Sequence, residues 1–237
     1  MAKSPGRILL LNLFAVLMLA GCAHKLQQPD HGPLKKISFI PVANPREFEV
    51  ANDNFFARFS GFASFAVSME NSRKSKVFAE KMRDEQMAMG KKLTQATLEE
   101  LAKQGYEVEL IERPEGTPRN PEDIDYTGIH ADGAALHVWI QDLGMASSVF
   151  RNDYIPRLTV AVELIYPQDS EFLYEEWLYY GAEAKEGKNW SVPGKPHYLF
   201  SNFEQMVNNP DQIVEDFDEG IRATAQHIGR EFRRAVK

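Results

Sequence analysis

The sequence has a single cysteine among its 237 residues, fewer basic than acidic residues, and no long hydrophobic run. Without a second cysteine the chain cannot form an internal disulfide, so we expect its stability to come from packing. The longest apolar run, Ile8 to Ala20, is interrupted only by Asn12. It is shorter than the roughly 20 apolar residues that a membrane-spanning helix needs. A permanent transmembrane helix is therefore not expected.

Common motifs of catalysis and metal binding are also missing. The sequence contains neither GxSxG nor HExxH, and its six histidines are scattered without cysteine partners. Zinc sites and serine hydrolases need such groupings, because several ligands or a nucleophile and its base must converge on one point. We therefore predict a non-enzymatic protein with no metal site and no cofactor.

The first 22 residues have the layout of a secretory signal peptide. Lys3 and Arg7 form a short basic stretch, the apolar run follows, and small residues stand immediately before Cys22. The sequence LAGC at residues 19–22 resembles the lipobox of bacterial lipoproteins, in which the cysteine sulfur receives a diacylglyceryl group and the peptide is cut just before it. The alternative is a soluble secreted protein whose cysteine is accidental.

This resemblance implies lipid attachment at Cys22 and a mature chain that is anchored to a membrane without spanning it. In the family, aspartate after the cysteine marks retention at the inner membrane. The residue here is Ala23, which implies the outer membrane, with the protein facing the periplasm. On this basis residues 1–21 are the signal peptide, residues 22–34 a polar tether with two prolines, and residues 35–237 a single α/β domain.

Acidic residues dominate the charge of the chain. There are 34 Asp and Glu against 27 Lys and Arg, and loss of residues 1–21 would remove two basic residues and no acid, which changes the net charge from −7 to −9. Such a surface repels phosphate backbones. Nucleic acid is therefore not an expected partner.

Apolar periodicity predicts an α/β fold. A long helix is expected over residues 77–104, and another from Pro210 toward the C-terminus with Asn209 as its N-cap. Short β-rich or alternating runs predict strands at residues 37–42, 106–112, 135–141, 157–166 and 172–180. The expected order is β-α-β-β-β-α, a single domain with a mixed sheet of about four or five strands and helices mainly on one face.

This order resembles the small α/β domains of envelope lipoproteins such as the curli-secretion channel protein and the lipoprotein activators of peptidoglycan synthases. The likeness rests on a short apolar strand, on a helix ending LAKQGYEV and on ADGAALHVWI at the start of the strand run. It is a likeness of layout, which implies the fold and transfers no function.

A phenylalanine-rich segment, residues 54–67, is the first candidate for partner binding. Its phenylalanines recur at spacings of three and four between small residues, and they include Phe59 and Phe62. The segment either fills the core beside the long helix or offers an exposed apolar patch to a partner or a bilayer surface.

The second candidate is the tryptophan- and tyrosine-rich part of the chain. Trp177, Tyr179 and Trp190 lie in a region with more aromatic residues than a sheet face and a loop ordinarily need. If the helices cover the aliphatic face of the sheet, Trp139 and Trp177 need other cover, supplied by residues 185–200 or by another protein.

We therefore expect an outer-membrane-anchored periplasmic lipoprotein that acts as a binding module for another envelope protein, as a monomer or a homo-oligomer. The predicted contact residues are Trp139, Trp177, Tyr179, Trp190, Phe59 and Phe62. An alternative is a small-ligand-binding protein or hydrolase with a pocket near His137 and Glu163. A third hypothesis is membrane remodelling or pore formation through the phenylalanine-rich segment.

Overall fold

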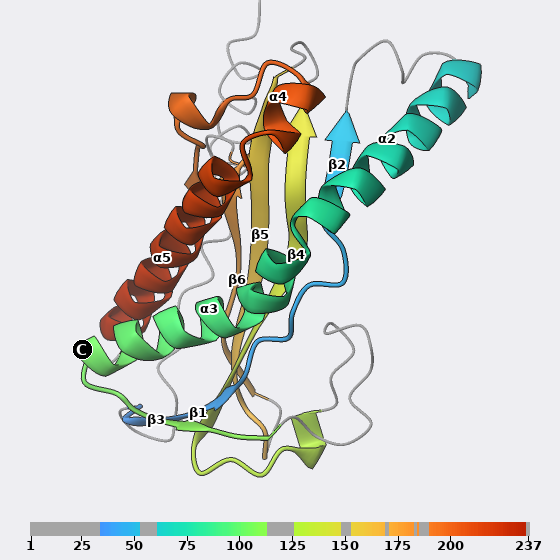
Figure 1. Cartoon of the computed structure of the whole chain (residues 1–237). Helices are drawn as coiled ribbons and strands as arrows, with labels where there is room; N and C mark the ends of the chain where they lie inside the picture. The colour runs from blue at the N-terminus through green and yellow to red at the C-terminus, as the bar shows by residue number, and fades with distance from the viewer. Residues whose placement is uncertain are drawn as a thin grey trace, which may run out of the picture.

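A seven-stranded mixed sheet forms the centre of the computed structural model (Figure 1). The structure describes residues 34–52, 61–112, 126–147, 153–168, 171–182, 184 and 190–235. The predicted signal peptide and lipidated cysteine lie outside these residues, as does most of the tether.

The sheet combines an antiparallel meander with parallel flanking strands. Its members are β1 (Lys36–Ile40), β2 (Glu49–Asn52), β3 (Glu107–Leu110), β4 (Ala134–Ser147), β5 (Tyr154–Tyr166), β6 (Glu171–Gly181) and β7 (Trp190–Val192). Six strands follow the order β3-β1-β4-β5-β6-β7, and β2 pairs with the far end of β4. The central strands β4, β5 and β6 are antiparallel, whereas β1, β2, β3 and β7 join in parallel.

The helices lie on one face of this sheet. They are α2 (Gly61–Lys81), α3 (Arg83–Lys103), α4 (Phe203–Val207) and α5 (Pro210–Ala235), with 3-10 turns η3 (Tyr126–Gly128) and η4 (Pro196–Tyr198). Figure 1 shows α3 and α5 crossing the sheet, α4 at one end, and α2 extending beyond the sheet. The predicted α/β class, the mixed sheet and the one-sided helix layer are confirmed.

The core lies between the sheet and α3 and α5. Apolar residues at every second position of β4 and β5 point toward the helices and are fully buried, as Val138, Val160 and Val162 illustrate. The apolar stripe of α5, including Phe217 and Ile228, packs on them. Burial of each such side chain contributes about 1.5–3 kcal/mol, so this layer provides the packing that a chain without disulfides requires.

The predicted helix over residues 77–104 is wrong at its N-terminal end. Helical structure begins at Gly61, and the chain changes direction at Met82, where φ is −102° and ψ is 13°. The backbone bonds continue through the break, because the Met82 N–H donates to Phe78 O and the Gln86 N–H to Met82 O, both at 2.9 Å. The break lets α3 cross the sheet while α2 leaves it. The prediction that α5 begins at Pro210 is confirmed.

The strand count of four or five was too low because β2 and β7 have only four and three residues. Segments this short carry no apolar period, and pairing with longer neighbours fixes them. For β2 the pairing depends on Gly144 of β4, where a Cβ atom would lie 1.9 Å from the Glu49 carbonyl oxygen. Only glycine allows the two backbones to approach this closely.

Candidate binding face of the sheet

Strand register gathers aromatic and charged side chains on the sheet face that points away from α3 and α5. Trp139 pairs with Ala161, and Ala161 pairs with Trp177. Directly paired residues of antiparallel strands point to the same face, so the two indoles flank the small Ala161 side chain. We call this surface the aromatic face; it comprises Tyr126, His137, Trp139, Glu163, Phe172, Glu175, Trp177 and Tyr179.

Exposure differs strongly across the aromatic face. Trp139 is only 3% exposed, whereas Trp177 and Tyr179 are half-buried and Glu175 is exposed. Phe172 is 46% exposed, which is unusual for a large apolar side chain. The side chains of β6 are therefore the ones that a partner can reach directly.

Tyr126 joins the aromatic face from η3. Its hydroxyl donates to Glu163 Oε2 and lies 2.7 Å from His137 Nδ1. Its ring meets Phe172 edge-on, with centroids 6.4 Å apart, and the His137 ring stacks on Trp139 at 4.7 Å. Burial, assisted by Glu163, raises the pKa of Tyr126 well above its usual range, so the phenol keeps its proton.

The single phenolic proton determines the hydrogen-bonding roles in this group. When Tyr126 donates to Glu163, the 2.7 Å contact requires His137 Nδ1 to donate to the phenolic oxygen. The three side chains then form a relay in the direction His137, Tyr126, Glu163. The donor from Tyr126 also offsets the repulsion between Glu163 and Glu175, which are direct cross-strand partners.

The predicted contact residues do not form one surface. Trp139 and Trp177 lie in one row, with Tyr179 on the same face of β6. Trp190 pairs with Leu178 and therefore points to the helix side, where its ring lies 4.6 Å from that of His227. Phe59 and the side chain of Phe62 lie outside the described residues.

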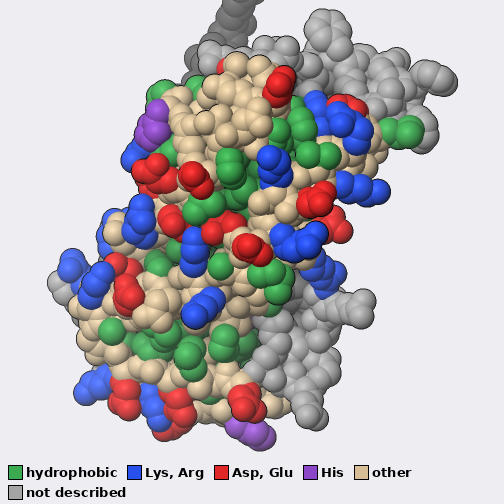
Figure 2. Space-filling view, viewed as in Figure 1, with side chains coloured by type: hydrophobic (Ala, Val, Ile, Leu, Met, Phe, Trp, Pro, Cys, Tyr) green, Lys and Arg blue, Asp and Glu red, His purple; other side chains and the backbone are tan. Residues whose placement is uncertain are grey.

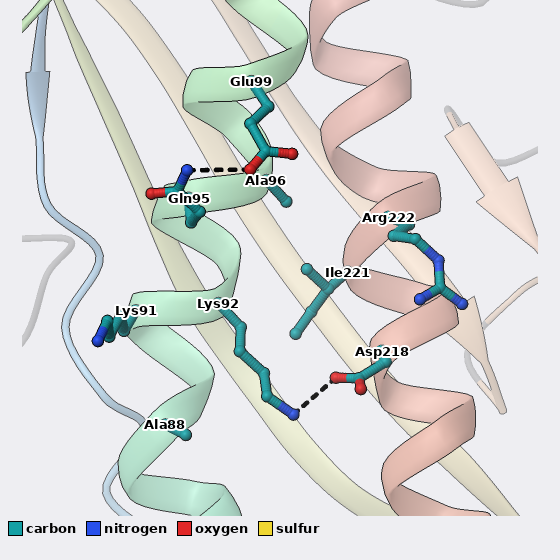
Figure 3. Close-up of a pocket in the computed structure, with 9 residues that line it drawn as sticks. All are labelled: Ala88, Lys91, Lys92, Gln95, Ala96, Glu99, Asp218, Ile221 and Arg222. Carbon is teal, nitrogen blue, oxygen red and sulfur yellow. Dashed lines mark hydrogen bonds and ion pairs between the residues drawn. The ribbon is translucent and has the colours of Figure 1, made fainter.

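Sequence reasoning missed a groove between α3 and α5 (Figure 3). It has a volume of about 480 Å³, and its floor includes Ile221 and Ala96. Lys92 bridges the two helices, because its Nζ lies 2.7 Å from Asp218 Oδ1 and 2.6 Å from Glu85 Oε1. Figure 2 shows acidic and basic side chains interspersed over this side of the molecule. The groove therefore has no single charge that selects a ligand.

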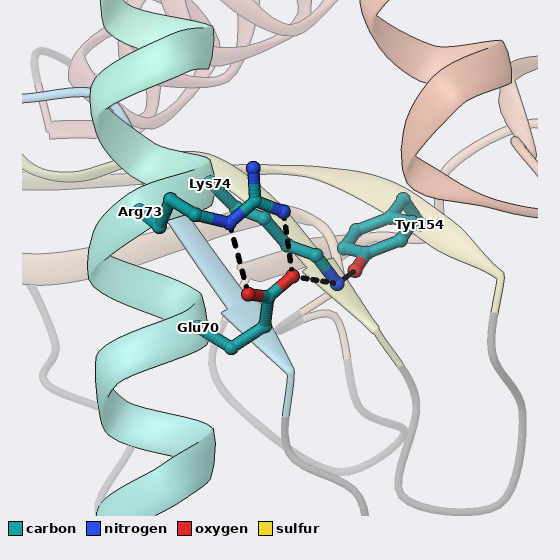
Figure 4. A network of polar contacts seen from close by, with 4 residues as sticks. All are labelled: Glu70, Arg73, Lys74 and Tyr154. Carbon is teal, nitrogen blue, oxygen red and sulfur yellow. Dashed lines mark hydrogen bonds and ion pairs between the residues drawn. The ribbon is translucent and has the colours of Figure 1, made fainter.

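A second polar cluster attaches α2 to the rest of the domain (Figure 4). Lys74 Nζ donates to the Tyr154 hydroxyl at 2.9 Å and lies 3.6 Å from Glu70 Oε1. The same ammonium lies 5.5 Å from the ring centroid of Phe203 on α4. These contacts link α2, β5 and α4, and Arg73 holds the Glu70 carboxylate in place with two hydrogen bonds.

The carboxyl groups of Asp216 and Glu176 both lie in the contact between α5 and β6. Asp216 is fully buried and accepts a hydrogen bond from the Tyr180 hydroxyl at 2.5 Å. Burial raises the pKa of Asp216 to about 7, although the bond from Tyr180 acts in the opposite direction. Glu176 accepts from His227 Nε2 at 2.9 Å and from Tyr174. Although burial opposes the effect, these bonds hold the pKa of Glu176 below its usual value.

The sequence contains one signal for the burial of Asp216. Its place among the acids at the start of α5, with Asp211 and Glu215, predicts only that the helix dipole favours its negative charge. However, Asp216 follows the core residue Ile213 by three positions and therefore belongs to the buried stripe.

Among the described residues, no three His, Cys, Asp or Glu side chains lie close enough together to hold a metal ion. In the same part of the chain, no helix combines the length and apolar character needed to cross a bilayer.

Comparison with known proteins finds likeness in structure alone. No family model matches the chain, and a search of curated proteins finds no significant match. A Xanthomonas campestris protein of family DUF330 is 6% identical, with 88% of this chain and 85% of that chain covered and a TM-score of 0.38. A neuraminyllactose-binding hemagglutinin homolog from Helicobacter pylori is 11% identical, with 88% and 91% covered and a TM-score of 0.37.

A third solved structure is lipoprotein GNA1162 from Neisseria meningitidis. It is 11% identical, with 65% of this chain and 88% of that chain covered and a TM-score of 0.27. At these values the three structures assign neither a function nor a residue role to this chain.

Proposed function

We propose that this chain is a lipoprotein, anchored by Cys22 in the outer membrane, that binds another component of the cell envelope through its aromatic face without catalysing a reaction. The observation that carries the proposal is the one-sided architecture of the described domain. Helices occupy one face of the sheet, and the other presents Trp177 and Tyr179 half-buried beside the exposed Phe172. The lipobox-like residues 19–22 support the anchoring.

The mechanism is capture by a tethered domain. A lipid anchor confines the domain to a membrane surface, which raises its effective concentration toward partners there. Tryptophan and tyrosine then supply large contact areas at low entropic cost. Glu175 and the acidic balance of the chain favour a partner that is not strongly anionic.

Site-specific photocrosslinking in whole cells tests the proposed surface. A crosslinker at Glu175 on the aromatic face should give a discrete adduct, whereas one at Gln95, an exposed position on α3, should not. Trp177→Ala should reduce the adduct at least about fivefold, because truncation of a central aromatic residue typically costs over 1 kcal/mol of binding energy. Cys22→Ala should reduce capture by removing the tether.

Three results would contradict the proposal. The first is an equal adduct from Gln95, and the second is undiminished capture by a folded Trp177→Ala protein. The third is the absence of fatty-acid labelling at Cys22, which would remove the anchoring part.

The relay of His137, Tyr126 and Glu163 favours a second candidate function, the binding of a small polar ligand. A relay that is already oriented could hydrogen-bond such a ligand with little reorganisation. A screen of periplasmic small molecules by thermal shift tests this function. A true ligand should raise the Tm of the wild type and fail to raise that of Tyr126→Phe. If no compound does so, the small-ligand function is rejected and only the binding-module function remains.

A further inference from the structure

The contact between α5 and β6 contains a buried carboxyl group with an incomplete set of partners. Asp216 has no exposed surface, and Tyr180 donates to its Oδ1. The second oxygen, Oδ2, is also buried, and no donor in the described part of the chain reaches it. A buried carboxylate oxygen without a donor is costly in its charged form, because protein atoms have replaced water without supplying its hydrogen bonds.

Close packing prevents the carboxyl group from turning toward solvent. Gly220 lies one turn further along α5, and a Cβ atom there would lie 2.9 Å from the ring of Tyr180. Tyr180 is itself only 1% exposed. Asp216 therefore leaves the contact only if α5 moves away from β6.

Charged and titratable groups surround Asp216 from three elements. They are Tyr180 on β6, Lys195 and Tyr198 on the segment around η4, and Glu215 and Glu219 on α5 itself. The one cation among them, Lys195, is ion-paired to Glu219 at 2.6 Å. Its positive charge therefore balances mainly the Glu219 carboxylate and does less to stabilise a charged Asp216. The remaining charges disfavour ionisation of Asp216, which burial already disfavours.

The segment that carries η4 depends on the same helix. Gln212 of α5 donates to the His197 carbonyl oxygen, and the Tyr198 side chain is buried. Movement of α5 away from β6 would therefore also release this turn.

We propose that Asp216 is a proton-dependent latch, whose neutral form holds α5 against β6 and whose ionisation loosens α5 and the η4 turn as the pH rises through neutrality. This property is independent of the proposed function. It would make the domain sensitive to the pH of its compartment without any bound ligand.

The direction of the effect follows from linkage. Burial raises the pKa of Asp216 from 3.8 to about 7 on folding. Between these values the folded state holds a proton that the unfolded state releases, so stability falls as the pH rises. The equilibrium constant for unfolding should increase by up to about tenfold per pH unit in this window and level off above about pH 7.

Urea unfolding of the purified full-length chain between pH 5 and 8.5 tests the latch. Relative to the wild type, Asp216→Asn should lose this part of the pH dependence, because the amide cannot ionise. Asp211→Asn changes an exposed acid in the first turn of the same helix and should keep the wild-type slope. Infrared spectroscopy of the folded wild type at pH 6 should show a protonated carboxyl band that Asp216→Asn lacks.

Tyr180→Phe gives a second test if Asp216→Asn does not fold. Removal of the donor to Oδ1 should move the loss of stability to higher pH, because the charged form loses its one hydrogen bond. The proposal is overturned if Asp216→Asn keeps the wild-type slope, if the infrared band is absent at pH 6, or if Tyr180→Phe moves the transition to lower pH.

Discussion

Glu176 and Asp216 lie in the same contact between β6 and α5, and the fold treats them in opposite ways. Glu176 receives hydrogen bonds from His227, from Tyr174 and from the backbone of Trp190, and its pKa is lowered. Asp216 receives one bond, from Tyr180, and its pKa is raised. Burial alone acts upward on both pKa values, so the hydrogen-bond donors and the neighbouring charges decide the direction: His227 lies beside Glu176, whereas Glu215 and Glu219 lie near Asp216.

The comparison shows how one helix contact can carry two opposed pH dependences. Stability from Glu176 is present above its unfolded value of 4.5 and is lost as the pH falls through the lower folded value. Stability from the neutral form of Asp216 is lost as the pH rises from about 4 to about 7. Below the unfolded pKa of Glu176 the two groups change stability in opposite directions, and well above it only the loss from Asp216 continues, up to about pH 7.

The largest expected effect comes from the same chemical change at both sites. Glu176→Gln removes a charged acceptor and should cost about 1–2 kcal/mol of unfolding free energy at pH 7, because hydrogen bonds to a charged group are the stronger ones. The difference from wild type should shrink as the pH falls below 4.5, the unfolded pKa of Glu176, because the unfolded wild type then takes up a proton before the folded protein does. For Asp216→Asn the difference should instead become more favourable to the variant as the pH rises.

Urea unfolding of both variants across pH 3 to 8.5 measures these two trends. Glu175→Gln, an exposed neighbour of Glu176 on the opposite face of β6, is the matched control and should stay within about 0.5 kcal/mol of wild type. The comparison fails if the two amide variants show the same trend with pH.

Glycines of α5 allow the close packing at the Asp216 end to be tested separately. Gly220→Ala places a methyl group 2.9 Å from the Tyr180 ring, whereas Gly229→Ala places one 3.2 Å from Glu100 Cβ on α3. Overpacking costs about 1–3 kcal/mol, and the gain in helix propensity returns about 1 kcal/mol. Thermal unfolding should therefore show a net loss of about 1 kcal/mol for Gly220→Ala and almost none for Gly229→Ala.

The Gly220→Ala variant also has an effect on titration. If the methyl group displaces the Tyr180 ring, the hydrogen bond from Tyr180 to Asp216 weakens. The pH-dependent loss of stability, measured by urea unfolding, should then extend to higher pH. Equal losses of stability for the two glycine variants would contradict the closer packing at Gly220. A large loss for Gly220→Ala with an unchanged pH profile would mean that this packing does not affect the titration of Asp216.

Long periodic segments were predictable from the sequence, and tertiary contacts were not. Pro210 and the apolar stripe after it placed α5 correctly, and alternation placed β4, β5 and β6, because these signals depend on local period. The break at Met82 depends on where α3 must cross the sheet. It leaves no local signal.

The candidate site shows the same limit. Alternation correctly put Trp139 and Trp177 on the face away from the aliphatic residues. The contact of Tyr126 with His137 could not be predicted from the sequence, because it depends on the path of the loop that joins η3 to β4. Likewise, no sequence pattern indicated that Trp190 would pack on His227 on the helix side of the sheet.

An effect as small as that of Gly220→Ala concerns a partly buried cation with several partners, the counterpart of Glu176. Lys74→Met keeps the aliphatic stem but removes the bond to Tyr154 and the contact with the Phe203 ring, which should cost about 1 kcal/mol. Lys76→Met, an exposed position two residues away, should cost less than about 0.5 kcal/mol. Hydrogen exchange should locate the loss, because amides of α2 should exchange faster in Lys74→Met while those of α5 keep their protection. Faster exchange in α5 would mean that the two helices open together, and the proton latch at Asp216 would then act on α2 as well.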